Sequence, residues 1–180
     1  MKEIKLINYK LQFEPLFHNF TFNGLEIITI NLLKPSNSIT LNAAELKIKK
    51  CSLIQRTKTI GARAKLNEKN ESLTINFSKN VKGLVKIRIE FIGILNDRLL
   101  GFYRSQYKDQ HGKKKFLATT QFEAADARRA FPCWDEPKMK ATFDVSLLVE
   151  NHLDVISNMP ISSKKKVGTR TLYEFERTPI

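Results

Sequence analysis

A period of two in the hydrophobic residues constrains the fold of this chain more than any other feature. Apolar and polar side chains alternate through Tyr9–Phe13, Ser72–Phe77 and Leu84–Ile94, and Leu25–Leu33 is rich in β-branched residues. A strand places successive side chains on opposite faces, whereas a helix requires a period of 3.6. No helical period is sustained before residue 96. This pattern predicts an all-β chain, folded as an antiparallel sandwich or a curved sheet.

Turn signals divide the predicted strands. Asn23-Gly24 stands between two apolar runs and predicts a hairpin turn, and Lys34–Ser38 predicts the next turn. Ala124–Phe131 is the one short segment with helical composition, preceded by Glu123 and stopped by Pro132. Strand character returns after it, and the predicted strands there are Thr142–Val149, Asp154–Ser157 and Leu172–Glu176.

Length and composition indicate one globular domain. The chain has 180 residues, of which 42% are hydrophobic and 27% charged. Its last residues, Thr178-Pro179-Ile180, look cut short, because a predicted strand has just ended and no closing element follows. No apolar run approaches the ~20 residues that cross a bilayer, and the start lacks a signal-peptide hydrophobic block. Cys51 and Cys133 give neither a disulfide framework nor a metal-binding spacing. We therefore expect a cytoplasmic protein without a membrane partner.

The net charge of +13 raises the question of a nucleic-acid partner. The excess of basic residues is +3 in residues 1–50, +10 in 51–115 and zero in 116–180. Nucleic-acid binders usually cluster this charge among aromatic residues. Here only Lys113–Lys115 and Lys164–Lys166 form clusters, and both stand beside glycines that predict solvated hairpin tips. A nucleic-acid partner is the least favoured reading of the sequence.

Residues 119–137 carry an unusual density of charge beside large aromatic side chains. Aromatic residues favour burial, and charges buried with them need partners, so the segment predicts a partly buried polar network. A structural ion-pair network and a binding site both fit this pattern, and such networks are common. The charged residues of the segment are Glu123, Asp126, Arg128, Arg129, Asp135 and Glu136.

Four consecutive landmarks resemble the aminopeptidase N family of zinc exopeptidases. They read GFYRSQY at 101–107, ATTQFEAADARRAFPCWDEP at 118–137, KATF at 140–143 and SNMP at 157–160. The resemblance implies that residues 1–180 are the amino-terminal domain of an aminopeptidase, a saddle-like antiparallel β-sandwich that packs on a thermolysin-like catalytic domain. That domain carries the H-E-x-x-H zinc site of the family. The sequence departs from the family pattern at Asn42, where a histidine is usual, and at Ala124, where a proline is usual.

The resemblance also implies roles for two residues. Glu123 matches the glutamate that holds the α-ammonium of the substrate, together with a glutamate of the catalytic domain's G-x-M-E-N loop. Gln121 matches the glutamine that lines the pocket for the first side chain. From the residues alone, Glu123 could instead be an N-terminal charge on the helical segment or a partner of Arg128. We assign Asp126, Arg128, Arg129, Asp135 and Glu136 to a network that supports the Gln-Phe-Glu turn.

The chain lacks the sequence of a zinc site. Its three histidines are His18, His111 and His152, none of which is followed by glutamate or paired at i, i+4 spacing. We therefore expect no metal ligand and no catalytic residue in this chain, with zinc bound only in a full-length enzyme and a peptide amino terminus as the partner of Glu123. The alternative function is a non-catalytic scaffold or protein-interaction module of aminopeptidase type.

Overall fold

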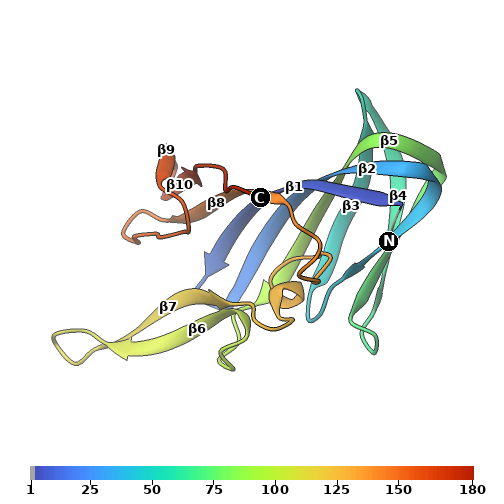
Figure 1. Cartoon of the computed structure of the whole chain (residues 1–180). Helices are drawn as coiled ribbons and strands as arrows, with labels where there is room; N and C mark the ends of the chain where they lie inside the picture. The colour runs from blue at the N-terminus through green and yellow to red at the C-terminus, as the bar shows by residue number, and fades with distance from the viewer. Residues whose placement is uncertain (1–2) are drawn as a thin grey trace.

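A computed structural model describes residues 3–180, and nearly all of its regular structure is strand (Figure 1). Within residues 3–180 the one helical element is η1, a single 3-10 turn at Ala127–Arg129. This composition confirms the predicted all-β class, including the short helical segment near residues 123–131. In chain order the strands are β1 Ile4–Leu16, β2 Thr21–Asn42, β3 Lys47–Gln55, β4 Lys58–Asn67, β5 Ser72–Ile94, β6 Gly101–Lys108, β7 Lys114–Gln121, β8 Thr142–Glu150, β9 Ile161–Val167 and β10 Arg170–Phe175.

Eight strands form one large curved sheet in the order β3-β4-β5-β2-β1-β8-β10-β9. All of its strand pairs are antiparallel except β1 with β8, which run parallel. β5 is long enough to pair with β4 through its first part and with β3 through its second part. The second sheet is the β6–β7 hairpin, which projects beneath the large sheet next to η1 (Figure 1).

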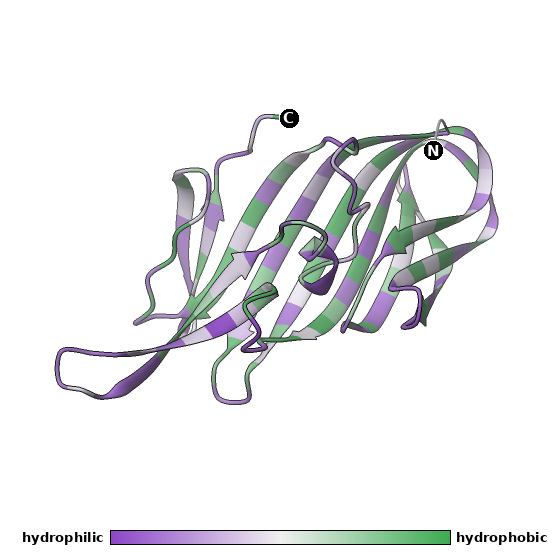
Figure 2. Cartoon of the chain, turned by 60° about the horizontal axis from the view of Figure 1, so that its bottom comes forward, coloured by the Kyte–Doolittle hydropathy of each residue, from purple (hydrophilic) through white to green (hydrophobic). Residues whose placement is uncertain are grey.

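The core lies on the face of the large sheet that carries η1 and the base of the β6–β7 hairpin. Hydrophobic and hydrophilic residues alternate along the strands in Figure 2, as the period of two predicts. Aromatic rings fill the centre, and Phe13 packs edge-to-face on Phe22, Phe102 and Phe131 with centroid separations of 5.9, 5.5 and 6.3 Å. A smaller cluster under β8 and β10 consists of Val149, Tyr173 and Phe175.

The predicted turn at Asn23-Gly24 is wrong, because both residues lie inside β2 and the β1–β2 turn is formed by residues 17–20. Gly24 pairs with Phe91 of β5, and a Cβ atom on Gly24 would lie 2.2 Å from the Phe91 ring. Gly93 and Phe22 form the reverse pair, with 2.1 Å between a Cβ on Gly93 and the Phe22 ring. The Phe91 ring therefore occupies the space of a Gly24 side chain, and the Phe22 ring that of a Gly93 side chain, so neither position has room for a larger residue.

Other local predictions also differ from the structure. Lys34–Ser38 forms no turn, because β2 continues through it with register shifts between Leu32 and Ser38. Lys164–Lys166 lies within β9, and the hairpin tip is Gly168-Thr169. Asp154–Ser157 is an irregular segment rather than a strand. Within residues 3–180, no helix is long and apolar enough to cross a membrane.

Candidate functional site

Gln121 and Glu123 lie where the β6–β7 hairpin returns to the body of the domain. Gln121 is the last residue of β7 and pairs with Gly101, the first residue of β6. Phe122 turns toward the core and packs edge-to-face on Phe131 at a centroid separation of 6.0 Å. The flanking side chains of Gln121 and Glu123 are exposed, and within residues 3–180 neither forms a side-chain hydrogen bond or an ion pair.

The residues after Glu123 form a tight loop. The Glu123–Ala124 peptide bond is cis. The Asp126 N–H donates a hydrogen bond to the Phe122 carbonyl at 2.9 Å, which closes the turn around Glu123. Asp126 in turn accepts bonds from Arg129, from Nε to its carboxylate at 2.9 Å and from the backbone N–H to its carbonyl at 3.1 Å. The turn that carries Glu123 is therefore attached directly to Arg129.

Two adjacent arginines join this loop to the large sheet. Arg128 contacts Asp135 at 2.9 Å and Glu71 at 3.1 Å, and its side chain is only 16% exposed. Arg129 contacts Glu71 at 3.0 Å and Glu45 at 2.6 Å, and its side chain is 18% exposed. Glu71 precedes β5, and Glu45 lies between β2 and β3. Loss of hydration opposes the charge of each arginine, but the hydrogen bonds to carboxylates outweigh it and raise both arginine pKa values.

The predicted network is present in part and extends further than the sequence suggested. Asp126, Arg128, Arg129 and Asp135 belong to it, whereas Glu136 pairs with Lys138 at 2.7 Å. Sequence reasoning missed Glu45 and Glu71, which are distant along the chain and carry no local signal. Glu123 is not a partner of Arg128, whose carboxylate partners are Asp135 and Glu71.

Segment 133–135 is fixed to the end of β2. Cys133 and Asn42 exchange backbone hydrogen bonds of 2.7 and 3.0 Å, and the Asn42 side-chain oxygen accepts a bond from the Asp135 N–H at 3.1 Å. Asn42 therefore supports the arginine network through Asp135. The backbone N–H of Trp134 donates a hydrogen bond to the Tyr9 hydroxyl at 3.1 Å. Burial raises the pKa of both Tyr9 and Cys133.

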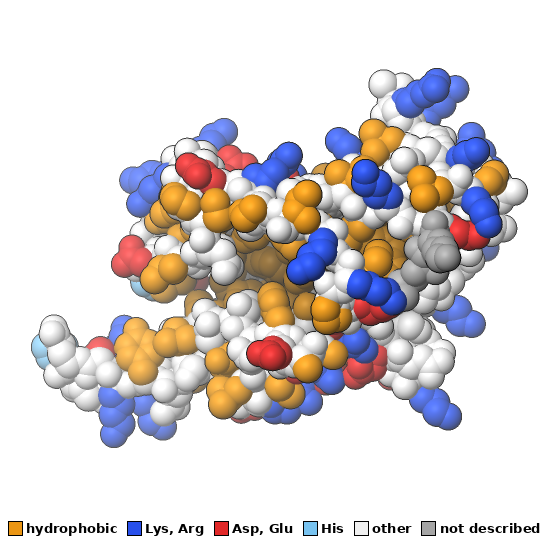
Figure 3. Space-filling model, viewed as in Figure 1, with side chains coloured by type: hydrophobic (Ala, Val, Ile, Leu, Met, Phe, Trp, Pro, Cys, Tyr) orange, Lys and Arg blue, Asp and Glu red, His pale blue; other side chains and the backbone are white. Residues whose placement is uncertain are grey.

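A large apolar groove lies on the core face of the large sheet. It has a volume of about 1090 Å³ and runs between the β1–β8 part of the sheet, the β6–β7 hairpin and the segment 152–159. Figure 3 shows this hollow with hydrophobic side chains along its walls. Phe122 contributes to its lining and separates it from the exposed Gln121 and Glu123. Its walls are mostly aromatic and aliphatic, with His152, Asp154 and Glu176 among the polar residues that line it.

The described residues do not fit a zinc ion. No three histidine, cysteine or carboxylate side chains within residues 3–180 are grouped closely enough to hold a metal. His111 is adjacent to Gln110 in the β6–β7 loop, and the exposed His152 lies 3.5 Å from Glu150.

Comparison with known proteins gives one consistent result. The sequence profile of the Peptidase M1 N-terminal domain matches residues 5–180. The chain is 39% identical to the puromycin-sensitive aminopeptidase of Caenorhabditis elegans over 177 residues, which is 96% of this chain and 19% of the relative. It is 39% identical to aminopeptidase M1 of Arabidopsis thaliana over 178 residues, 96% of this chain and 20% of the relative. It is 36% identical to aminopeptidase 2 of Candida albicans over 183 residues, which is 98% of this chain and 19% of the relative. The chain thus spans about a fifth of the length of these curated relatives.

Proposed function

The chain belongs to the Peptidase M1 N-terminal domain family, and on this premise we propose that it binds the free amino terminus of a peptide for a zinc aminopeptidase. The membership confirms the resemblance noted at residues 101–160. One observation supports the proposed role above the others. Asp126, Asp135 and Glu136 each pair with a basic side chain, whereas Glu123 has no partner within residues 3–180.

An exposed, unpaired carboxylate on a fixed loop is suited to recognising a chain end. The α-ammonium of a peptide has a pKa near ~8 and is largely charged at neutral pH, whereas an internal amide carries no charge. A charge-assisted hydrogen bond from the ammonium to Glu123 would contribute about 1.5–3 kcal/mol. Gln121, two residues away, offers an amide to the first side chain of the same peptide.

Arg129 supports this arrangement by limiting the motion of the loop. Because Arg129 holds Asp126, and Asp126 closes the turn at Phe122, the backbone at Glu123 is held in place relative to the sheet. A fixed anchor for the ammonium sets how far the first peptide bond lies from the catalytic groups, which makes cleavage exopeptidic.

The remaining parts of an aminopeptidase would come from a catalytic domain. In this proposal that domain holds the zinc ion, which supplies the activated water, and adds a second carboxylate for the ammonium. Residues 1–180 then act as one amino-terminal domain that does not hydrolyse peptides by itself. A cytoplasmic setting agrees with the two free cysteines, one half-buried and one buried.

The test is a chimaera in which this chain replaces the matching segment of the C. elegans enzyme. We expect the chimaera to release amino-terminal residues, and Glu123→Gln to lower kcat/KM by about 10- to 100-fold at unchanged zinc content. Glu136→Gln is the matched control, because it removes the same charge from a carboxylate paired with Lys138. Equal kcat/KM for the Glu123→Gln variant and the parent chimaera would refute the assignment.

A second measurement uses the chain alone. A peptide with a free amino terminus should shift the backbone NMR signals of residues 121–126, and its N-acetylated form should not. If the chimaera holds zinc but is inactive, and both peptides leave these signals unchanged, the domain is a scaffold rather than a substrate-binding element.

A further inference from the structure

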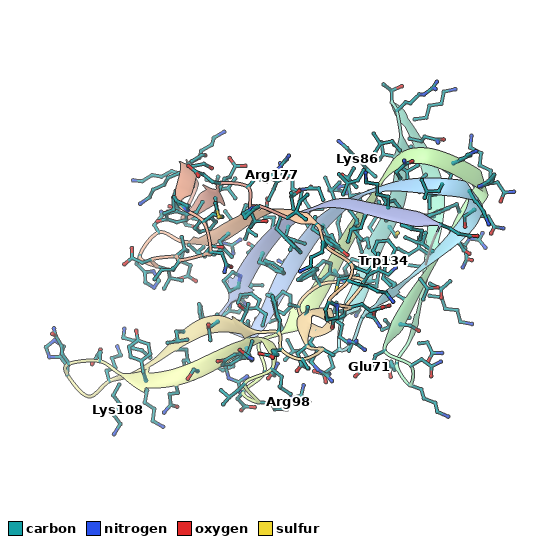
Figure 4. All side chains as sticks on the ribbon, viewed as in Figure 1. Glu71, Lys86, Arg98, Lys108, Trp134 and Arg177 are labelled. Carbon is teal, nitrogen blue, oxygen red and sulfur yellow. The ribbon has the colours of Figure 1, made fainter. Side chains whose placement is uncertain are left out.

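The outer face of the large sheet, opposite η1, has a different chemistry from the core face. Figure 4 shows Lys86 on this outer side and Trp134 on the side of η1. The outer face of β1, of β2 through residue 33, and of β5 from residue 82 carries no aromatic side chain. Lysines and aliphatic residues stand next to each other there instead.

Three exposed aliphatic side chains occupy one end of this face. Ile7 is 36% exposed, Leu33 49% and Leu84 59%. Ile7 faces outward because a bulge between Leu6 and Asn8 places an extra residue in β1. Scattered aliphatic residues of this kind need no explanation on most surfaces, so their neighbours decide whether they matter.

Lysines surround these aliphatic side chains. Asn31 of β2 lies opposite Lys5 on β1 and opposite Leu84 on β5, so Lys5 and Leu84 are two strands apart, about 10 Å. Lys82 and Lys86 flank Leu84 on the same face of β5. The resulting lysine–aliphatic patch consists of Lys5, Ile7, Leu33, Lys82, Leu84 and Lys86.

The positive charge of the patch is not neutralised by the protein. Among residues 3–180, the lysines that form ion pairs with carboxylates are Lys34 and Lys138, and neither belongs to the patch. The carboxylates of β1 and β5 on this face, together with Glu3 and with Asp144 of β8, are each paired with another basic side chain. These pairs are Glu3 with Lys34, Glu90 with Arg88, Glu14 with Arg170 and Asp144 with Arg177.

We propose that the lysine–aliphatic patch binds the surface of a membrane that contains anionic phospholipids. Unpaired lysines are attracted to the negative headgroups, and the exposed aliphatic side chains between them can enter the boundary between headgroups and acyl chains. The combination supplies the two signals that stable peripheral binding needs. This inference does not depend on the proposed binding of a peptide amino terminus, which uses the other side of the sheet.

Two features favour a lipid surface over other polyanions. Nucleic-acid surfaces of this size usually stack bases on aromatic side chains or fork arginines onto phosphates, and the patch has neither group. Its aliphatic side chains would add nothing to a phosphate backbone. Neither the apolar groove on the core face nor the smaller cavity around Gln12, Leu25 and Arg88 is lined by a residue of the patch. The sequence predicted no membrane partner because it lacks a spanning segment, a criterion that does not detect a basic sheet face.

Vesicle flotation of the full chain tests the proposal. We expect binding to phosphatidylcholine vesicles containing about 30% phosphatidylserine, and none to pure phosphatidylcholine. The triple variant Lys5→Gln/Lys82→Gln/Lys86→Gln should reduce partitioning roughly 100-fold, since each lysine near the surface accounts for about fivefold. Lys164→Gln/Lys165→Gln/Lys166→Gln on β9 removes the same charge elsewhere and should change partitioning less than about fivefold. Thermal unfolding verifies that all variants are folded.

The contribution of the aliphatic residues separates a membrane from a generic polyanion. Leu33→Ser/Leu84→Ser keeps every charge and should lower vesicle partitioning about fivefold or more while leaving retention of RNA on filters unchanged. Absence of binding to the anionic vesicles at low salt would overturn the proposal. Equal losses from the two lysine triplets, or full binding by the leucine double variant, would overturn it as well.

Discussion

In the loop of residues 122–136 each half-buried charge lies beside an opposite charge, whereas the Glu26 carboxyl, at the centre of the large sheet, has no partner. Arg128 and Arg129 share Asp126, Asp135, Glu45 and Glu71. Glu26 of β2 is 0% exposed, and neither carboxylate oxygen has a hydrogen-bond partner within residues 3–180. The first arrangement keeps charges ionised near the surface, and the second requires the carboxyl to remain neutral.

The surroundings of Glu26 explain the difference. It lies between Leu11 of β1 and Ile89 of β5, and the next residue in that row is Cys51 of β3. Burial raises the pKa of Glu26 well above its usual range. No basic side chain contributes to this shift, so nothing nearby stabilises the carboxylate. The free energy of unfolding should therefore fall when a charged side chain of the loop is removed and rise when the Glu26 carboxyl is removed.

The largest effect is expected from Arg129→Ala, which leaves Asp126, Glu45 and Glu71 without their shared partner. Because this side chain is only 18% exposed, we expect a loss of about 2–4 kcal/mol in the free energy of unfolding. Arg98→Ala is the matched control, because Arg98 also pairs with Glu45 but its side chain is 51% exposed. This substitution should lower the free energy of unfolding by less than about 0.5 kcal/mol. Urea denaturation followed by tryptophan fluorescence measures both, and equal losses would show that burial does not strengthen the loop network.

Removing the unpaired carboxyl should stabilise the domain. Glu26→Leu replaces a buried polar group with an aliphatic side chain, and we expect the free energy of unfolding at neutral pH to rise by about 1–3 kcal/mol. Urea denaturation again gives the value. A destabilised Glu26→Leu variant would mean that the carboxyl makes a favourable interaction in solution, and the contrast with the loop would then disappear.

The pH dependence of stability sharpens the same contrast. The unfolded chain releases the Glu26 proton near pH 4.5, whereas the folded chain keeps it to a higher pH. Stability of the native chain relative to Glu26→Gln should therefore fall as pH rises above 4.5, by at most about 1.4 kcal/mol per pH unit. Burial raises the pKa of Cys51 to about 11 and also raises those of Tyr9 and Cys133, so these neighbours stay neutral from about pH 5 to 8. Parallel stability curves for the two proteins over that range would contradict the prediction.

The sequence predicted the strands well where polar and apolar residues alternate, because burial on one face imposes that pattern directly. It failed at Gly24, since a glycine that admits the Phe91 ring looks the same in sequence as a glycine in a turn. It also could not reveal Glu26 as buried. In the run from Leu25 to Leu33 both faces carry apolar residues, and the run alone does not show which face the glutamate joins.

The candidate site was predictable only in its local part. The resemblance at residues 118–137 named Gln121 and Glu123. The density of charge in residues 119–137 grouped the two arginines with Asp126, Asp135 and Glu136, of which Glu136 pairs with Lys138 instead. The partners from the sheet were not predictable, because Glu45 and Glu71 reach the arginines only after β2 to β5 have paired. Contacts between residues distant in sequence are set by strand register, which no short motif encodes.

The smallest effect on stability is expected from Glu123→Gln, although this residue lies in the same loop as the arginine network. Its carboxylate is exposed and unpaired within residues 3–180, so the free energy of unfolding should change by less than about 0.5 kcal/mol. The Asp135 side chain is only 11% exposed and contacts Arg128. Asp135→Asn weakens this contact and should lower the free energy of unfolding by about 1–2 kcal/mol in the same urea experiment. A charge that is conspicuous in the sequence but contributes nothing to folding is free to serve a ligand. A substantial loss for Glu123→Gln would instead place the residue among the structural charges of the loop.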